Sequence, residues 1–291
     1  MRQFKLALAV ATVTALLVAA PASAITYGEP DAEEHPYVGF MIFYDPIDEG
    51  WFSCSGTLMD ANTFLTAGHC TFGIEDNAWV TFDPTDTLAV WPSRRDIGTL
   101  YADEDELNEA RRAWLNDPAN GYVSGTAIPH PSYDGFGGFP VNYDVGVVEL
   151  DASLSGPYAV LAPIGTAEQL AGPTGRNRNA ALVETVGYGT QSVQPHPQND
   201  DDRYKSTSRI VQVNGSISRG GNLHTLNNPS PVGGTGGSCF GDSGGPVLVN
   251  DTNQVLAVVS FGFSGTCHGA DYSWRVDTQD SYDFLQPYLR S

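Results

Sequence analysis

The sequence predicts an all-β protein, on the grounds of its composition and its patterning. Of 291 residues, 32 are Gly and 19 are Pro, with no repeating period, and this many turn-formers favours short strands over long helices. Hydrophobic residues make up 41% of the chain and charged residues only 16%, which supplies a core and is unlike a disordered chain. The net charge of −20 argues against nucleic-acid binding through a basic face.

Short apolar runs rich in β-branched residues recur along the chain, separated by clusters of Gly, Pro, Asn and Asp. This pattern is typical of a β-sandwich or barrel. The runs predict strands at 37–44, 52–59, 79–82, 145–150, 182–186, 210–213, 247–249 and 255–263. Segments 170–180 and 194–202 are expected to be exposed loops.

Two helices are predicted among these strands. Over 103–116, Asp103 and Glu106 have the spacing of a helix cap, and Arg111 and Arg112 fall near the end, where cations favour the helix dipole. A second helix is expected over 278–289, although Pro287 disfavours its last turn.

Residues 1–24 have the pattern of a secretory signal. Arg2 and Lys5 precede an apolar run at 6–20, and small residues follow at 21–24. A membrane anchor is the alternative, but the run is short for a bilayer. We therefore expect a secreted protein, free of the membrane once the signal is removed, whose first residue is Ile25.

Four cysteines in an exported chain predict two disulfides. Three pairings are possible, and Cys54–Cys70 with Cys239–Cys267 closes the smallest loops. A metal site is the alternative, but the sequence has no Cys-x-x-Cys or His-x-x-x-His spacing. We expect neither a metal nor a cofactor.

Three motifs carry chemistry. Residues 241–246 are Gly-Asp-Ser-Gly-Gly-Pro, residues 66–70 are Thr-Ala-Gly-His-Cys, and Asp144 stands before the apolar run 145–150. Each motif alone fits a turn, a structural histidine or a strand edge. Together they supply a hydroxyl, an imidazole and a carboxylate, the groups that nucleophilic catalysis by serine requires.

These motifs resemble those of the trypsin/chymotrypsin family of serine endopeptidases, over nearly the whole chain after residue 24. The serine motif is intact, while Gly68 replaces the second alanine of the family's Thr-Ala-Ala-His-Cys. The resemblance implies that Ser243 is the nucleophile, His69 the general base and then acid, and Asp144 the carboxylate that orients the imidazole. It also implies that the backbone N–H groups of Gly241 and Ser243 form the oxyanion hole.

The resemblance implies a fold of two antiparallel six-stranded β-barrels packed together, with an inserted helix and a C-terminal helix. Residues 25–151 would form the barrel that carries His69 and Asp144. Residues 152–291 would form the barrel with Ser243, the oxyanion hole, the specificity pocket and the C-terminal helix. His69 and Asp144 lie 75 residues apart, more than in most relatives, which implies an insertion containing the helix at 103–116.

The resemblance further implies an activating ion pair between the freed N-terminus of Ile25 and the carboxylate of Asp242, with no separate zymogen step. It implies a specificity pocket with the members Gly237, Ser260, Phe261 and Gly262. Gly237 stands where trypsins carry an aspartate. Asp271 is either an acid on the opposite pocket wall or a solvated loop residue, and the sequence leaves both open.

The resulting expectation is a monomeric, secreted serine endopeptidase that acts on proteins or peptides. One alternative is an inactive homologue that only binds. The other is an α/β-hydrolase esterase, which would need a helix after the Gly-x-Ser-x-Gly serine, where this sequence predicts a strand. Of the other histidines, His130 is expected to be structural. Four more are expected to be isolated and exposed: His35, His196, His224 and His268.

Overall fold

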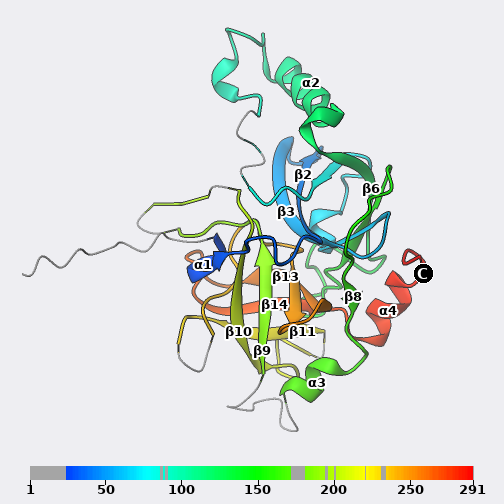
Figure 1. Cartoon of the computed structure of the whole chain (residues 1–291), viewed down its shortest axis with the longest axis vertical. Helices are drawn as coiled ribbons and strands as arrows, with labels where there is room; N and C mark the ends of the chain where they lie inside the picture. The colour runs from blue at the N-terminus through cyan, green and yellow to red at the C-terminus, as the bar shows by residue number, and fades with distance from the viewer. Residues whose placement is uncertain are drawn as a thin grey trace, which may run out of the picture.

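Two β-barrels lie against each other in the computed structural model of the chain (Figure 1). The structure describes residues 24–85, 88, 91–171, 181–193, 196–199, 201–219, 221–230 and 234–290. Residues 1–23 of the expected signal at 1–24 lie outside these residues. So do 172–180 of the expected loop at 170–180, and 194–195 and 200 of the expected loop at 194–202.

The first barrel closes from six antiparallel strands in the order β2-β3-β4-β7-β6-β5. The strands are β2 (Val38–Asp45), β3 (Gly50–Leu58), β4 (Thr63–Thr66), β5 (Ala78–Thr81), β6 (Val123–Pro129) and β7 (Gly146–Leu150). Its interior is filled by large side chains from several strands, including the fully buried Phe64 and Leu65 of β4 and Val147 of β7. The sequence analysis predicted the strands β2, β3, β5 and β7 from their apolar runs, but it did not predict β4 or β6.

The second barrel is closed because β9 pairs with both β12 and β10. Its strands are β9 (Leu182–Gly187), β10 (Tyr204–Gln212), β11 (Asn222–Asn227), β12 (Pro246–Val249), β13 (Gln254–Gly262) and β14 (Gly269–Arg275). Two short strands attach to it: β1 (Glu29–Pro30) pairs with β10, and β8 (Val160–Leu161) runs parallel to β13. The prediction of two six-stranded antiparallel barrels is confirmed.

The first and the last described segments of the chain each join the barrel that the other half builds. The turn α1 (Ala24–Tyr27) and β1 lie against β10 of the second barrel. Helix α4 (Gln279–Leu285) packs on the first barrel, where Phe284 contacts the ring of His130 and Thr63 Oγ1 donates to the carbonyl of Tyr288 at 2.8 Å. This exchange ties the two barrels together on both sides of their contact.

The insertion between β5 and β6 carries helix α2 (Glu104–Leu115), which stands beyond the first barrel at the top of Figure 1. Asp103 caps it as predicted, because its Oδ1 accepts from the N–H of Glu106 at 3.1 Å. Two 3₁₀ turns flank it, η2 (Arg94–Asp96) and η3 (Pro118–Asn120).

The C-terminal helix is shorter than predicted. Thr278 caps it and it ends at Leu285, before Pro287. Helix α3 (Thr166–Ala171), which enters the expected loop at 170–180, was not predicted. No helix in the described part of the chain is long and apolar enough to cross a membrane.

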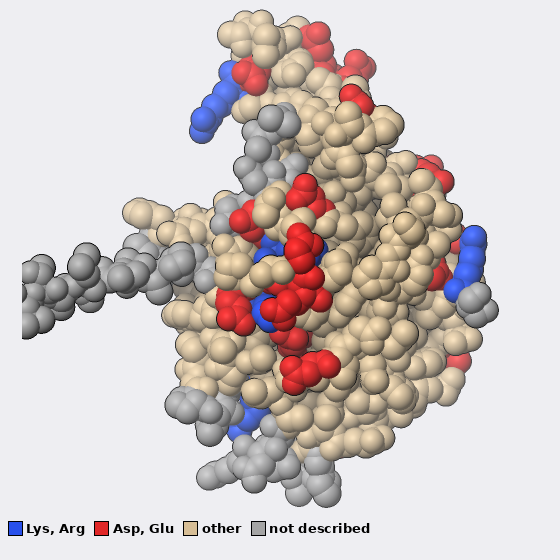
Figure 2. Space-filling model, viewed as in Figure 1, with Lys and Arg blue, Asp and Glu red and all other residues tan. Residues whose placement is uncertain are grey.

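His35 is buried in an ion network, so the expectation that it is isolated and exposed is wrong. Its Nδ1 bonds to Asp31, whose other carboxylate oxygen accepts from Arg203 Nε at 2.8 Å. Its Nε2 faces Glu184 of β9 at 3.4 Å, and Lys205 bonds Glu34 at 2.6 Å beside them. Figure 2 shows the acidic side chains of this face gathered over β9 and β10, around basic atoms. The network fastens the segment after β1 to the second barrel.

Replacing His35 with glutamine should destabilise the protein more at pH 6 than at pH 9.5. Burial alone would lower the pKa of His35, but its bonds to Asp31 and Glu184 raise it to about 9. A raised histidine pKa adds to the free energy of unfolding, by about 3 kcal/mol at most. This contribution is complete below about pH 6.5 and is lost as the pH rises through 9. Urea unfolding at both pH values measures the difference. The exposed His196→Gln is the control, and an equal loss at both pH values would contradict the prediction.

Candidate active site

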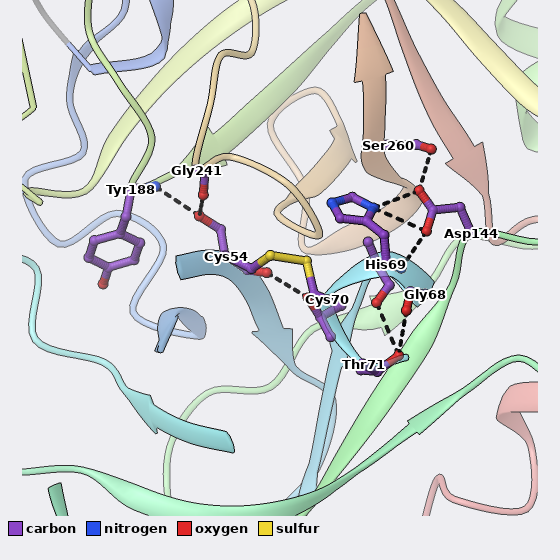
Figure 3. Close-up of a disulfide and its surroundings, with 12 residues drawn as sticks. Cys54, Gly68, His69, Cys70, Thr71, Asp144, Tyr188, Gly241 and Ser260 are labelled. Atoms are coloured by element: carbon purple, nitrogen blue, oxygen red, sulfur yellow. Dashed lines mark hydrogen bonds and ion pairs between the residues drawn. A yellow bond between two sulfur atoms is a disulfide. The ribbon is translucent and has the colours of Figure 1, made fainter. Parts of the chain in front are cut away.

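His69 lies on the 3₁₀ turn η1 (Gly68–Cys70), directly after β4 of the first barrel. Cys70 forms a disulfide with Cys54 of β3, which fixes the turn beside that strand (Figure 3). The backbone N–H of His69 donates to Asp144 Oδ1 at 2.7 Å, and its ring Nδ1 lies 2.9 Å from Asp144 Oδ2. Backbone and ring are therefore held by one carboxylate, and ring Nε2 points away from it.

Gly68 departs from the family motif for a visible reason. A Cβ atom on Gly68 would lie 3.0 Å from the ring of Tyr133 and 3.1 Å from Asp144 Oδ1. Such contacts are tighter than ordinary van der Waals packing. The glycine accommodates the aromatic ring that covers the buried carboxylate.

Asp144 is fully buried just before β7 and is held by three donors. Besides the two groups of His69, Ser260 Oγ of β13 donates to Oδ2 at 2.5 Å (Figure 3). Burial alone would raise the pKa of Asp144, but His69 and the hydrogen bonds hold it below its usual value. Burial would likewise lower the pKa of His69, and the charge of Asp144 raises it. The pair therefore favours an ionised carboxylate beside a more basic imidazole.

Ser243 lies in the loop between β11 and β12, and this loop packs directly on the strands that carry the histidine. The Ser243 carbonyl accepts from the N–H of Ser55 at 2.8 Å. The next residue, Gly244, has φ +77°, and a Cβ there would lie 2.0 Å from Thr66 Oγ1 and 2.7 Å from the nitrogen of Ala67. Only glycine permits that approach. The structure thus brings the serine loop against the segment that leads into His69.

The loop before Ser243 turns its carbonyls toward the scaffold. The carbonyl of Gly241 accepts from Ser55 Oγ at 2.9 Å, and that of Phe240 accepts from the N–H of Thr190 at 2.6 Å. No acceptor for the N–H of Gly241 or of Ser243 occurs among the described residues. Gly241 has φ +95°, a conformation that favours glycine. Two backbone donors are therefore available beside the serine, as an oxyanion hole needs. The sequence analysis did not single out Ser55, which sits beside Cys54 without a motif of its own.

A cavity of about 230 Å³ opens beside Ser243. Ser260, Phe261 and Gly262 of β13 form one wall, and the disulfide Cys239–Cys267 borders it. Asp271 of β14 lines it and is only 8% exposed. Gly237 does not line it, because Gly237 is buried against Thr26 and the side chain of Asn227. The residue that lines the cavity at this end is Ser238.

Asp271 is held by Ser238, whose N–H and Oγ both donate to Oδ2, at 2.8 and 2.9 Å. Burial raises the pKa of Asp271 to about 6, against the opposing effect of these bonds. Of the two possibilities left open by the sequence, the pocket wall is the one observed, and a solvated loop position is excluded.

Ile25 and Asp242 are both fully buried. Thr26 pairs with Gly237, whose N–H donates to the Thr26 carbonyl at 3.3 Å, so the segment is fixed beside the residue that precedes Ser238. Asp242 accepts from the N–H groups of Gly189 and Cys239, both at 2.8 Å. Within the described residues of the uncleaved chain no cation pairs with Asp242, and burial raises its pKa to about 7.

The esterase alternative fails on the backbone. The chain after Ser243 enters strand β12, whereas the elbow of an α/β-hydrolase leads into a helix. A metal ion is a separate possibility at His69, because its ring lies near Cys54 and Cys70, with the potential ligand atoms within 4.8 Å of one another. Both sulfurs are engaged in the disulfide, however, and they offer no thiolate to a metal.

Comparison with known proteins gives a consistent result. A model of the Trypsin family matches residues 102–283, which is more than half of the chain. Trypsin from Saccharopolyspora erythraea is 26% identical over 245 residues, covering 80% of this chain and 84% of the relative. Serine protease SP24D from Anopheles gambiae is 26% identical over 238 residues, covering 82% and 72%. CLIP domain-containing serine protease B10 from the same mosquito is 24% identical over 233 residues, or 79% of this chain, and the match covers only 60% of the relative.

Solved structures share the same fold. The structure described as HL collagenase superposes with a TM-score of 0.58 at 18% identity, covering 87% of this chain and 93% of its own. The structure described as HBP gives a TM-score of 0.58 at 17% identity, covering 92% and 97%. At these identities the likeness establishes the two-barrel fold alone.

Proposed function

Because this chain belongs to the trypsin family of serine endopeptidases, we propose that Ser243, His69 and Asp144 act as its catalytic triad in peptide-bond hydrolysis. One observation carries the proposal. The imidazole of His69 is fixed through Nδ1 by a fully buried carboxylate, which leaves Nε2 to accept a proton from a hydroxyl. The serine loop packs on the same segment.

The chemistry follows from these groups. Ser243 Oγ attacks the scissile carbonyl carbon while Nε2 of His69 takes the hydroxyl proton, and the carbonyl oxygen becomes an oxyanion facing the N–H groups of Gly241 and Ser243. The intermediate collapses, the C–N bond breaks, and His69 returns the proton to the leaving amine. Water then attacks the acyl-enzyme with its proton passing to His69, and the acid product leaves as Ser243 regains its hydrogen.

We also propose that the protein acts outside the cell, as a monomer, on peptide or protein substrates. Two disulfides are in keeping with an oxidising compartment. The sequence of residues 1–24 supports export.

Covalent labelling by a serine-directed fluorophosphonate tests the proposed function. We expect stoichiometric labelling of the chain that begins at Ile25, and none of Ser243→Ala, because the probe reacts only with an activated serine. The exposed Ser216→Ala is the matched control and should label fully. A folded wild-type chain that takes no label would instead favour the non-catalytic binding homologue, and labelling without peptide cleavage would contradict peptide-bond hydrolysis.

Asp271 is proposed to select a basic residue before the scissile bond, since a buried carboxylate on the pocket wall suits a guanidinium or ammonium. Asp271→Asn should lower kcat/KM for an Arg substrate at least tenfold more than for a Phe substrate. Below about pH 6 the preference for Arg should fade in the wild type as the carboxyl takes up a proton. Parallel assays of matched Arg, Phe, Leu and Glu substrates measure this. The exposed Asp251→Asn is the control, and an unchanged Arg-to-Phe ratio in Asp271→Asn would refute the role.

A further inference from the structure

A second and larger cavity, of about 650 Å³, lies on the other side of the loop that carries Phe240 and Gly241. Phe240 borders both cavities, while Gly241 lines only the larger one. One wall comes from the β2–β3 hairpin and the opposite wall from the insertion that carries α2. Figure 1 shows this insertion standing beyond β2 and β3.

The position of this cavity defines which part of a substrate enters it, given the proposed function on which this inference rests. The scissile carbonyl oxygen would face the N–H of Gly241, and the preceding side chain would occupy the Asp271 cavity. The chain after the scissile bond then leaves across Gly241 on the opposite side. That direction leads into the larger cavity.

The insertion forms a fixed wall. Trp51 Nε1 of β3 donates to Asn108 Oδ1 of α2 at 2.7 Å, and the ring of Trp91 packs edge-on against Trp51 and Trp114, at 5.3 and 5.6 Å between centroids. Trp79 Nε1 of β5 donates to Asn116 at the end of the helix, at 2.9 Å. Aromatic packing with directed hydrogen bonds holds α2 in one position on the barrel.

Arg111 of α2 is the unusual group in this wall. It is only 8% exposed, its guanidinium lies over Trp91 at 5.2 Å, and its Nε donates to the carbonyl of Pro92 at 3.1 Å. No carboxylate among the described residues is within 4.0 Å of it. A buried cation without an anion is costly, and Arg111 lines the cavity.

The other charges of the cavity do not neutralise Arg111. Glu104 is already paired with Arg94, at 2.9 Å. Glu49 is exposed in the turn between β2 and β3. The cavity therefore offers a planar, half-satisfied guanidinium beside aromatic walls, and a carboxylate is the complementary group.

We propose that the insertion builds a binding site for the leaving segment of the substrate, in which Arg111 binds a carboxylate located after the scissile bond. The carboxylate is either an acidic side chain or the free C-terminus of a short leaving segment. This assigns to the insertion a specificity that the Asp271 cavity does not provide.

Fluorogenic peptides with one constant sequence before the scissile bond distinguish the two sources of the carboxylate. In C-terminally amidated peptides, Glu replaces Gln at the first, second or third position after the bond. In a second set, peptides without Glu carry a free or an amidated C-terminus. We expect kcat/KM to be about tenfold higher for a carboxylate at one position, and Arg111→Met to abolish that preference. Arg95→Met, at an exposed arginine of the same insertion that does not line the cavity, is the matched control and should retain it.

A substrate with only a nitroanilide leaving group reports the proposed function separately, because it places nothing in the larger cavity. Its hydrolysis should be the same in wild type and Arg111→Met. Binding of the same two sets of peptides to folded Ser243→Ala measures the preference for a carboxylate without catalysis. Wild-type kcat/KM that is equal for Glu and Gln peptides and also equal for free and amidated peptides, or loss of the preference in Arg95→Met, would overturn the assignment to Arg111.

Discussion

Asp144→Asn should lower kcat about 10⁴-fold, a magnitude that we take from the trypsin triad itself and do not derive. The carboxylate holds both the backbone N–H and the ring Nδ1 of His69. An amide at this position retains the shape but can turn its NH₂ toward Nδ1, which selects the wrong tautomer and removes the charge that stabilises the imidazolium. Steady-state hydrolysis of a short peptide substrate measures the loss.

The same variant should move the acid limb of the pH profile. In the wild type, Asp144 raises the pKa of His69 above its ordinary value, and only the neutral imidazole accepts a proton. Activity should therefore fall as the pH drops through this raised pKa, and the limb of Asp144→Asn should lie at lower pH. Ser260→Ala, which removes a single bond to the carboxylate, is the graded control with a loss of about tenfold. An unshifted limb in Asp144→Asn would show that the carboxylate does not set the basicity of His69.

The parts of the fold that could be predicted from the sequence are those where local pattern and tertiary environment agree. Strands β2 and β13 are continuous apolar runs because they lie between layers of core. The start of helix α2 could be predicted because its cap, Asp103, and the N–H group that it binds lie within one turn of the sequence. His69 and Ser243 of the proposed triad stand out because glycine and cysteine neighbours give them short motifs.

The parts that could not be predicted depend on partners far along the chain. His35 has acidic neighbours and was expected to be exposed, yet it is buried because Asp31 next to it pairs with Arg203, 172 residues from Asp31. Strand β14 was missed because its buried Arg275 does not follow an apolar pattern. Arg275 is satisfied by Glu168 and Asp277. Only the folded arrangement supplies these counter-charges.

The pocket illustrates the same limit at the scale of one residue. Counting back from the serine identified Gly237, but the chain turns so that Ser238 lines the cavity and Gly237 pairs with Thr26. Likewise, the length of the insertion was evident, while the cavity beside Arg111 depends on tryptophans from three separate segments.

A chain that begins one residue early, at Ala24, should be about 10²–10⁴-fold less active than the chain that begins at Ile25. We expect the free ammonium of Ile25 to pair with Asp242, whose carboxylate is buried and, among the described residues, bonded to the N–H groups of Gly189 and Cys239 alone. Asp242 stands between the two proposed oxyanion donors, so its ionisation and position set their geometry. Loss of a partner from a buried ion pair costs about 3–5 kcal/mol, which corresponds to this range. Active-site titration and kcat/KM of the two chains measure the effect.

The pH dependence of stability gives an independent test of the same pair. In the uncleaved chain, burial raises the pKa of Asp242 to about 7, so the folded state retains a proton that the unfolded state loses near pH 4. Stability from this group therefore decreases as the pH rises from about 4 to 7, by up to about 4 kcal/mol. The ammonium of Ile25 should remove this penalty, so that the chain beginning at Ile25 gains more in Tm over the Ala24 chain at pH 7.5 than at pH 4.5. In Asp242→Asn the two chains should melt alike at both pH values. A gain that is independent of pH, or one that persists in Asp242→Asn, would mean that the new N-terminus stabilises the fold without reaching this carboxylate.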